Sequence, residues 1–257
     1  MPTVPPSSSF AWPHGKQCAV SLSFDDGRPT QLDRGVAILD AHGVPATFYL
    51  TPPWMDQRAS EWRDVAQSGH EIGNHTMTHP CTGNLEFTRE NPIEDYTLER
   101  MDAELARANA VIAELVGVTP TTFAYPCGGT FLGRGEQAAS YVPLVAKRFL
   151  AGRGYWEPYP NAPGLCDLAH LLGCSFDALT FDQTKKLIER TINEAGWLIL
   201  VGHNICANDW QGVDPEVLSR ICQYLGGNDA VWVDTIAAVA QYVRDARTDA
   251  SRAVTRA

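Results

Sequence analysis

Short apolar runs alternate with amphipathic stretches along most of this chain. The apolar runs predict buried strands, because each is too short for a core helix and is bounded by polar or turn-forming residues. These predicted strands are Cys18–Phe24, Ala46–Thr51, His70–Gly73, Thr121–Tyr125, Arg148–Ala151, Trp197–Val201 and Ala230–Val233. Strands that alternate with helices are typical of a parallel sheet, because a crossover helix connects each strand to the next.

The amphipathic stretches predict helices, and the clearest of them covers Pro92–Val116. Asn91 is suited to the N-cap, Pro92 to the first helical position, and Gly117 to the end. Apolar side chains recur there at spacings of three and four residues, at Met101, Leu105, Ala108, Ile112 and Leu115. The other predicted helices are Gln31–His42, Ser60–Ser68, Val213–Leu225 and Thr235–Ala246.

This order of elements predicts one α/β domain. About seven parallel strands without a dinucleotide-binding glycine pattern favour a (β/α) barrel over an open sheet, and barrels of this length fold as one domain. We assign residues 16–246 to the barrel. Residues 1–15, which begin with a segment rich in Pro and Ser, are expected to form a flexible arm, and residues 247–257 a polar tail that frays.

The charge of the chain limits its partners. The formal net charge is −10 and the pI is about 5.1. An acidic protein lacks the basic field that attracts nucleic acid or anionic membranes, so neither is an expected partner. No apolar run reaches the roughly 20 residues of a membrane-spanning helix, and no signal peptide is visible. We therefore expect a cytoplasmic protein, unless a leader precedes this sequence.

The cysteines predict neither a disulfide framework nor a thiolate zinc site. There are seven, an odd number, and none forms a C-x-x-C pair. Most are expected to be small buried hydrophobic residues.

Three polar clusters directly follow predicted strands. Asp25 and Asp26 follow the first strand, His75 and His79 follow the third, and His203 follows the run WLILV. The carboxyl ends of parallel barrel strands meet at one face, so we expect these side chains to converge. Two histidines and one carboxylate form a known catalytic metal arrangement, which leaves the second carboxylate free as a base.

Each cluster also has a simpler interpretation. Asp25 and Asp26 stand in the sequence Asp-Asp-Gly-Arg-Pro, which favours a turn. His75 and His79 could be unrelated histidines, and His203 could be a core histidine bonded to the backbone. The sequence alone leaves these alternatives open for each cluster taken singly.

Four motifs, SFDDG, HEIGNHTMTHP, FAYPCGG and LILVGH, resemble in order those of the polysaccharide deacetylase family, the NodB homology domain of carbohydrate esterase family four. The resemblance extends from Cys18 to Val243. It implies a distorted (β/α) barrel and a metal-dependent hydrolase that removes acetyl groups from N-acetylated sugars, so a carbohydrate is the implied substrate.

The resemblance also assigns roles to individual residues. It implies that Asp25 is the catalytic base and His203 the general acid. The implied metal ligands are Asp26, His75 and His79. One divalent ion is expected, with zinc favoured and cobalt, nickel or iron also compatible with this donor set. The third motif suggests contacts to the oxyanion or the substrate from Tyr125, Pro126 and Cys127, in which Cys127 contributes its backbone N–H.

The sequence departs from the family pattern at two points. Ala124 stands where the family usually has an arginine that orients the base, and Arg153 is a candidate replacement, although it could also be a solvated surface residue. The fourth motif, an aspartate with a nearby tryptophan, is not evident. Its candidates are Trp156, Glu157 and Asp167.

Two other functions remain open at this point. Some members of the same superfamily hydrolyse cyclic imides or ureides, which requires a different pocket around the same metal. A non-catalytic carbohydrate-binding protein is disfavoured, because the implied base, acid and ligands are all present. The sequence does not indicate the oligomeric state.

Overall fold

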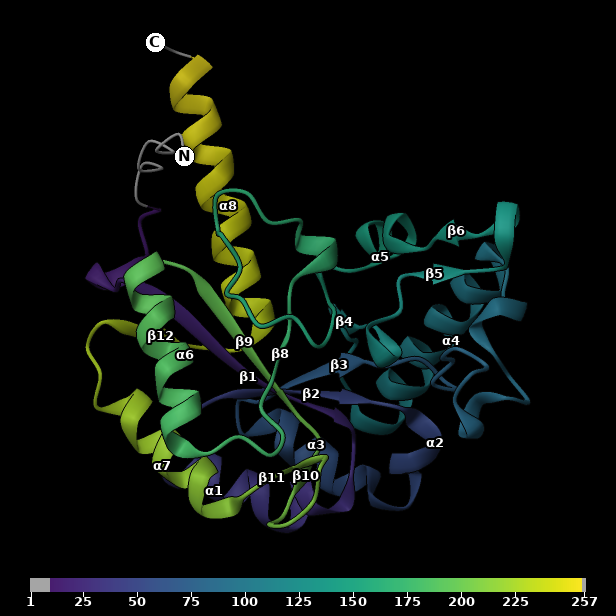
Figure 1. Ribbon diagram of the computed structural model, residues 1–257, viewed down its shortest axis with the longest axis horizontal. Coiled ribbons are helices and arrows are strands. Elements are labelled where there is room, and N and C mark those ends of the chain that lie inside the picture. The colour runs from purple at the N-terminus through teal and green to yellow at the C-terminus, as the bar shows by residue number, and fades with distance from the viewer. Residues whose placement is uncertain (1–9, 256–257) are drawn as a thin grey trace.

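The computed structural model describes residues 10–255, apart from the side chains of residues 56 and 250–255. One eight-stranded sheet forms its centre, and every strand pairing in that sheet is parallel (Figure 1). Its strands are β1 (Cys18–Asp26), β2 (Ala46–Leu50), β3 (Glu71–Asn74), β4 (Thr122–Ala124), β7 (Ala151–Arg153), β8 (Cys174–Ser175), β9 (Trp197–Gly202) and β12 (Val231–Val233). Two small two-stranded pairs lie outside this sheet, β5 (Phe131–Leu132) with β6 (Ala139–Ser140) and β10 (Asn204–Ile205) with β11 (Gly212–Val213).

The sheet curls into a distorted barrel that is only partly closed. Its strand order is β7-β4-β3-β2-β1-β9-β8, and β12 pairs with the beginning of β1. Between the two edge strands, the segment before β8 is linked to β7 by a single bridge, from Arg153 to Leu171. Hydrogen bonds from the Leu171 N–H to the Gly152 carbonyl (2.7 Å) and from the Gly154 N–H to the Leu171 carbonyl (2.8 Å) support it. The predicted α/β barrel is confirmed.

Helices cover the sheet. They are α1 (Val36–Ala41), α2 (Pro52–Met55), α3 (Ala59–Gln67), α4 (Leu98–Val116), α5 (Val142–Arg148), α6 (Phe181–Glu194), α7 (Pro215–Gly226) and α8 (Ile236–Thr255). A π-helical turn, Gln31–Gly35, precedes α1. Single 3₁₀ turns occur at Pro13–Gly15, Asp56–Arg58, Glu86–Thr88, Ile93–Asp95, Pro126–Gly128, Gly135–Gln137 and Leu168–His170. In Figure 1, α1 and α6 both pack beside α7, while α8 projects beyond the sheet.

Strand β1 is buried along its whole length because both of its faces are covered. Val20, Leu22 and Phe24 belong to the core that includes residues of α3, α6 and α7. Ala19 points the other way, into a second core with Val239 of α8. This double burial explains why the first strand carries only small or apolar side chains up to the two carboxylates at its end.

The long helix begins later than its sequence predicts. Pro92 is extended (φ −71°, ψ 145°), a separate 3₁₀ turn follows at Ile93–Asp95, and α4 starts at Leu98. Thr97 is the N-cap, since its side chain accepts a hydrogen bond from the Arg100 N–H (3.2 Å). The predicted start at Pro92 with Asn91 as cap is therefore wrong, whereas the predicted end at Gly117 is confirmed, in the left-handed conformation (φ 89°).

Loss of this cap should destabilise the fold modestly. We expect Thr97→Ala to lower the free energy of unfolding by about 1 kcal/mol, because the Arg100 N–H loses its acceptor. Thr97→Ser keeps a hydroxyl at the same position and should retain most of the stability. Urea unfolding of the three proteins measures both effects, and equal stability of the alanine and wild-type proteins would contradict the assigned cap.

Several elements were not expected from the sequence, among them α5, α6 and β8. Strand β7 is displaced along the chain, since it occupies Ala151–Arg153 instead of Arg148–Ala151 and Arg148 ends α5. The displacement matters for the site, because it puts Arg153 at the carboxyl end of a sheet strand. Among the described residues, no helix is long and apolar enough to cross a bilayer.

The described parts of the predicted arm and tail contain a packed side chain and a helix. Residues 1–9 and 256–257 lie outside the described part of the chain. Within the predicted arm, Trp12 is buried, donates from its indole N–H to the Ala195 carbonyl (3.0 Å) and stacks on Tyr242. Helix α8 continues through Thr255, so the described part of the predicted tail is helical.

Candidate active site

The carboxyl ends of three strands bring the predicted polar clusters together. Asp25 and Asp26 end β1, and His75 comes directly after β3. The Asp26 Oδ1 atom lies 3.5 Å from His75 Nε2 and 3.6 Å from His79 Nε2. His203 follows β9, which pairs directly with β1. The predicted convergence of residues far apart in sequence is present in the structure.

Asp26, His75 and His79 have the geometry of a metal site. Their ligand atoms all lie within 4.8 Å of one another. The Asp26 Oδ1 atom is buried and has no hydrogen-bond partner among the described residues, which is costly for a carboxylate oxygen. A divalent cation between this oxygen and the two imidazole nitrogens would satisfy it, and one oxygen with two nitrogens suits zinc and related ions. The residues present therefore fit such a metal.

Both histidines are prepared to ligate through Nε2. His75 Nδ1 lies 2.9 Å from the Ala124 carbonyl, which can only accept, so Nδ1 carries the proton and Nε2 keeps its lone pair. Burial, together with the neighbouring His75, lowers the pKa of His79 to about 4, so this imidazole is neutral near pH 7. A neutral imidazole is the form that binds metals.

The backbone is held in unusual conformations at this site. Asp26, Thr76, His79 and Cys127 all have positive φ, at 76°, 66°, 49° and 52°. Such conformations cost energy for non-glycine residues and persist only where the surroundings impose them. Around the histidines, the Thr76 N–H donates to Asn74 Oδ1 (2.8 Å) and the His79 N–H donates to Thr76 Oγ1 (2.9 Å). These bonds fix the loop that carries both imidazoles.

Asp25 pairs with Arg153. The Arg153 side chain is completely buried and donates from Nη2 to Asp25 Oδ1, so the interpretation of Arg153 as a solvated surface residue is wrong. Burial alone would raise the pKa of Asp25, but Arg153, His75 and His203 outweigh it, and the pKa lies below its ordinary value. Asp25 is thus a carboxylate held in one orientation near the histidines.

Asp26 has a different cationic partner. Its Oδ2 atom accepts from Arg28 Nε at 2.9 Å, and Arg28 Nη2 donates to Gln211 Oε1 at 3.0 Å. Asp25 and Asp26 are only 3% and 5% exposed, which a solvated turn does not explain. The two adjacent carboxylates therefore have separate surroundings, Asp25 facing a buried guanidinium and Asp26 facing the two imidazoles.

His203 is held by an aspartate that the sequence analysis missed. Its Nδ1 lies 2.6 Å from Asp177 Oδ2, and its backbone N–H donates to Asp177 Oδ1 at 3.0 Å. The Tyr155 hydroxyl donates to the same Oδ2 at 3.1 Å. Burial would lower the pKa of His203, but Asp177 and Asp25 outweigh it and the pKa is raised, so the imidazolium is favoured. Asp177 comes shortly after β8. Because the sequence pattern did not predict this strand, it did not indicate Asp177 as a site residue.

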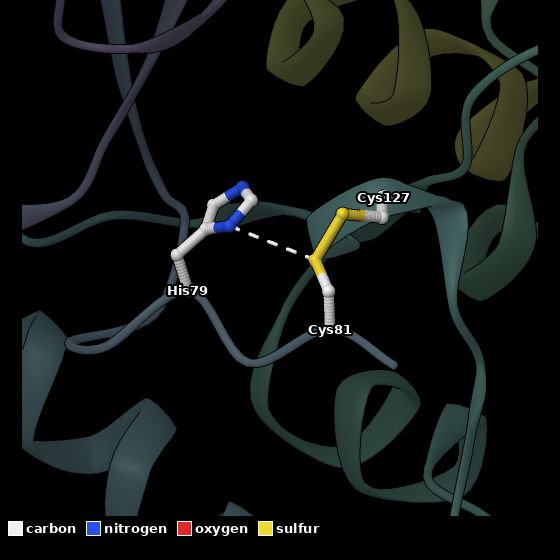
Figure 2. Close-up of side chains that lie close together, drawn as sticks. All are labelled: His79, Cys81 and Cys127. Carbon is white, nitrogen blue, oxygen red and sulfur yellow. Dashed lines mark hydrogen bonds between the residues drawn. A yellow bond between two sulfur atoms is a disulfide. The ribbon is translucent and has the colours of Figure 1, made fainter. Parts of the chain in front are cut away.

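The residues of the third motif divide between the core and the surface. Tyr125 is completely buried and donates from its hydroxyl to the Ala169 carbonyl (2.7 Å), so its side chain has a structural partner. Pro126 is also buried, whereas Cys127 is exposed. Cys127 forms a disulfide with Cys81, beside His79 (Figure 2). This disulfide was not expected, since the cysteine pattern argued against a disulfide framework, and three of the other cysteines, Cys18, Cys174 and Cys222, are buried free thiols.

The candidates for the fourth motif are scattered. Trp156 is 70% exposed. Together with Tyr155 and Trp210 it lines a cavity of about 520 Å³, and the Tyr155 ring contacts the His203 ring. The Glu157 carboxylate accepts from the Gly173 N–H (3.3 Å), and Asp167 caps a 3₁₀ turn. Both acids thus have local structural partners, and Asp177 is the acid in contact with the site.

Comparison with known proteins identifies the family. The sequence profile of the family described as polysaccharide deacetylase matches residues 13–141. A chitooligosaccharide deacetylase of Sinorhizobium fredii is 41% identical over 63 residues, which are 24% of this chain and 29% of that enzyme. The matched parts cover less than a third of the first curated relatives. The chain belongs to the polysaccharide deacetylase family.

Solved structures agree with the fold. A candidate polysaccharide deacetylase from Mycobacterium smegmatis superimposes with a TM-score of 0.70, at 17% identity, over 93% of this chain and 94% of that one. A family 4 acetyl xylan esterase from Clostridium thermocellum, solved with a cobalt ion, gives a TM-score of 0.58 at 22% identity, over 87% and 91% of the two chains. At these identities the likeness shows a shared fold.

Proposed function

We propose that this protein hydrolyses the acetamide group of an N-acetylated sugar with one divalent metal ion. The observation that carries the proposal is the buried, unpartnered Asp26 Oδ1 faced by two imidazoles, beside the Asp25–Arg153 pair. Family membership and the likeness to a chitooligosaccharide deacetylase support the substrate class. The cobalt ion of the structurally similar esterase supports the metal.

The metal would be held by Asp26, His75 and His79. When bound, the ion would act as a Lewis acid, which would polarise the amide carbonyl and make a bound water acidic enough to lose a proton near neutral pH. Zinc is favoured by the mixed nitrogen and oxygen donors, and cobalt, nickel or iron also fit them. Arg28 holds the other oxygen of Asp26, so the free Oδ1 stays directed at the imidazoles.

Asp25 is suited to be the general base. Its carboxylate is ionised, because Arg153, His75 and His203 offset its burial, and Arg153 holds Oδ1. The second oxygen, Oδ2, lies 3.9 Å from His75 Nε2 and faces the site. Asp25 would therefore accept the proton of the attacking water, and the backbone N–H of Cys127 would stabilise the developing oxyanion.

His203 is suited to be the general acid. An amide nitrogen leaves as an anion only with difficulty, so it needs a proton as the carbon–nitrogen bond breaks. Asp177 holds the Nδ1 side of the ring and favours the imidazolium. His203 thus delivers a proton from Nε2 to the departing amine.

This pairing predicts a change in pH dependence. Asp177→Asn removes the negative charge that raises the pKa of His203, so that pKa should fall and the basic limb of the rate profile should move to lower pH. At pH values above this limb, kcat/KM should fall by no more than about 10²–10⁴-fold, which is the contribution of general acid catalysis. The measurement is kcat/KM against pH.

Asp167→Asn is the matched control, because Asp167 caps a 3₁₀ turn. Its pH profile should equal that of the wild type. An unchanged basic limb in Asp177→Asn would show that Asp177 does not set the protonation of His203.

Acetate release tests the proposed function. Acetate is measured for N-acetylglucosamine oligomers, peptidoglycan fragments and acetylated xylan, and ring opening, which releases no acetate, is measured for small cyclic imides. Each reaction is run with and without a chelator. We expect chelator-sensitive acetate release from the N-acetylated sugars. Turnover of cyclic imides alone would instead identify an amidohydrolase, and binding of sugars without any turnover would identify a carbohydrate-binding protein.

A further inference from the structure

The Cys81–Cys127 disulfide lies against a proposed metal ligand. His79 Nδ1 is 3.6 Å from Cys81 Sγ, as Figure 2 shows, while His79 Nε2 is 3.6 Å from Asp26 Oδ1. The two nitrogens of one imidazole therefore face two different sets of groups. On one side lies the proposed catalytic metal site, and on the other lies a pair of sulfur atoms.

The sulfur side contains a second complete set of ligand atoms. Those of His79, Cys81 and Cys127 lie within 4.8 Å of one another. In the part of the chain that the structure describes, only two such groups of three occur, and His79 belongs to both. While the disulfide is closed, its sulfur atoms cannot act as thiolates. Once it opens, two thiolates and an imidazole form a donor set that suits zinc.

We propose that reduction of Cys81–Cys127 creates a second metal site, formed by these two thiolates and His79, for zinc or another thiophilic ion. A neutral imidazole has one lone pair for a metal, so the second site competes with Asp26 and His75 for His79. The disulfide thereby reserves His79 for catalysis, a consequence that rests on the proposed function. The second site itself rests only on the positions of the three residues.

The disulfide is accessible to a reductant from one side. Cys127 is exposed, whereas Cys81 is only 2% exposed. With a phosphine reductant, the S–S bond breaks, phosphorus is oxidised to the phosphine oxide with oxygen from water, and two thiols form with the protons of that water. Zinc then replaces the two thiol protons, which are released to solvent. The Cα atoms are already 6.1 Å apart, so both sulfurs stay near His79.

The three buried free cysteines are poor competitors for such an ion. Burial raises the pKa of Cys18 and Cys222 to about 12 and that of Cys174 to about 11, so these thiols hold their protons. Cys166 and Cys206 are partly exposed and offer matched positions for a control.

Cobalt(II) absorption tests the second site. Metal-free protein is titrated with cobalt before and after treatment with tris(2-carboxyethyl)phosphine, and free thiols are counted in parallel. We expect near-ultraviolet sulfur-to-cobalt charge-transfer absorption only after reduction. The Cys81→Ser/Cys127→Ser variant should lack this absorption after reduction, and the Cys166→Ser/Cys206→Ser variant should retain it.

Three results would overturn the proposal. One is the absence of the band in reduced wild-type protein whose thiol count shows an open disulfide. Another is an equal band in the Cys81→Ser/Cys127→Ser variant. The third is a disulfide that stays closed under the reductant in folded protein. Acetate release by the disulfide-intact protein is measured separately, so failure of the proposed function leaves the cobalt result standing.

Discussion

Asp25→Asn should retain the divalent metal and lose turnover by about 10²–10⁴-fold, because an amide cannot accept the proton of the attacking water. Asp25 faces Arg153, whereas Asp26 faces both imidazoles, so the metal ligands remain in place in this variant. The measurement is metal content beside kcat for purified protein.

Asp26→Asn is the matched variant at the neighbouring position. It should lose metal affinity, because a neutral amide oxygen is a weaker ligand than a carboxylate for a divalent cation. If Asp25→Asn loses metal and Asp26→Asn keeps it, the two roles are reversed. If both variants keep metal and activity, neither carboxylate is needed for metal binding or catalysis and the proposed mechanism fails.

Arg153→Ala should lower both stability and rate. Removing one partner of a buried ion pair leaves the other charge unpaired, at a cost of about 3–5 kcal/mol in the free energy of unfolding. The Asp25 carboxylate also loses its fixed orientation, and kcat should fall by about tenfold or more, which corresponds to about 1.4 kcal/mol. The pKa of Asp25 should rise without Arg153, so the acid limb of the rate profile moves to higher pH.

Two further variants separate these effects. Arg134 forms an exposed ion pair with Asp95, so Arg134→Ala should change stability by no more than about 0.5 kcal/mol. In Arg153→Ala/Asp25→Asn the unpaired charge is absent, so the double variant should be more stable than Arg153→Ala. Wild-type stability and kinetics in Arg153→Ala would show that another group orients Asp25.

The ends of the buried strands could be predicted from the sequence. Strands β1 and β9 read as mainly apolar runs, and β3 as a brief strand; polar residues follow directly at the end of each. Parallel pairing then brings Asp26, His75 and His203 to one face. These site residues were therefore found from pattern and topology, together with the resemblance to a known family.

The partners of these residues could not be predicted in the same way. Arg153 and Asp177 lie far along the chain from Asp25 and His203, and their contacts depend on short strands with little apolar signal. The disulfide joins two loops that meet only because β3 and β4 are neighbours in the sheet. Such pairings are set by tertiary packing, which local sequence patterns do not encode.

We propose above that a metal held by Asp26, His75 and His79 drives acetyl hydrolysis. The most direct test is to titrate metal-free, disulfide-intact protein with zinc or cobalt while measuring acetate release from N-acetylglucosamine oligomers. We predict no release without metal, a rise with each addition and a plateau at one equivalent. Undiminished release by the metal-free protein, or no release at any metal concentration, would contradict the claim.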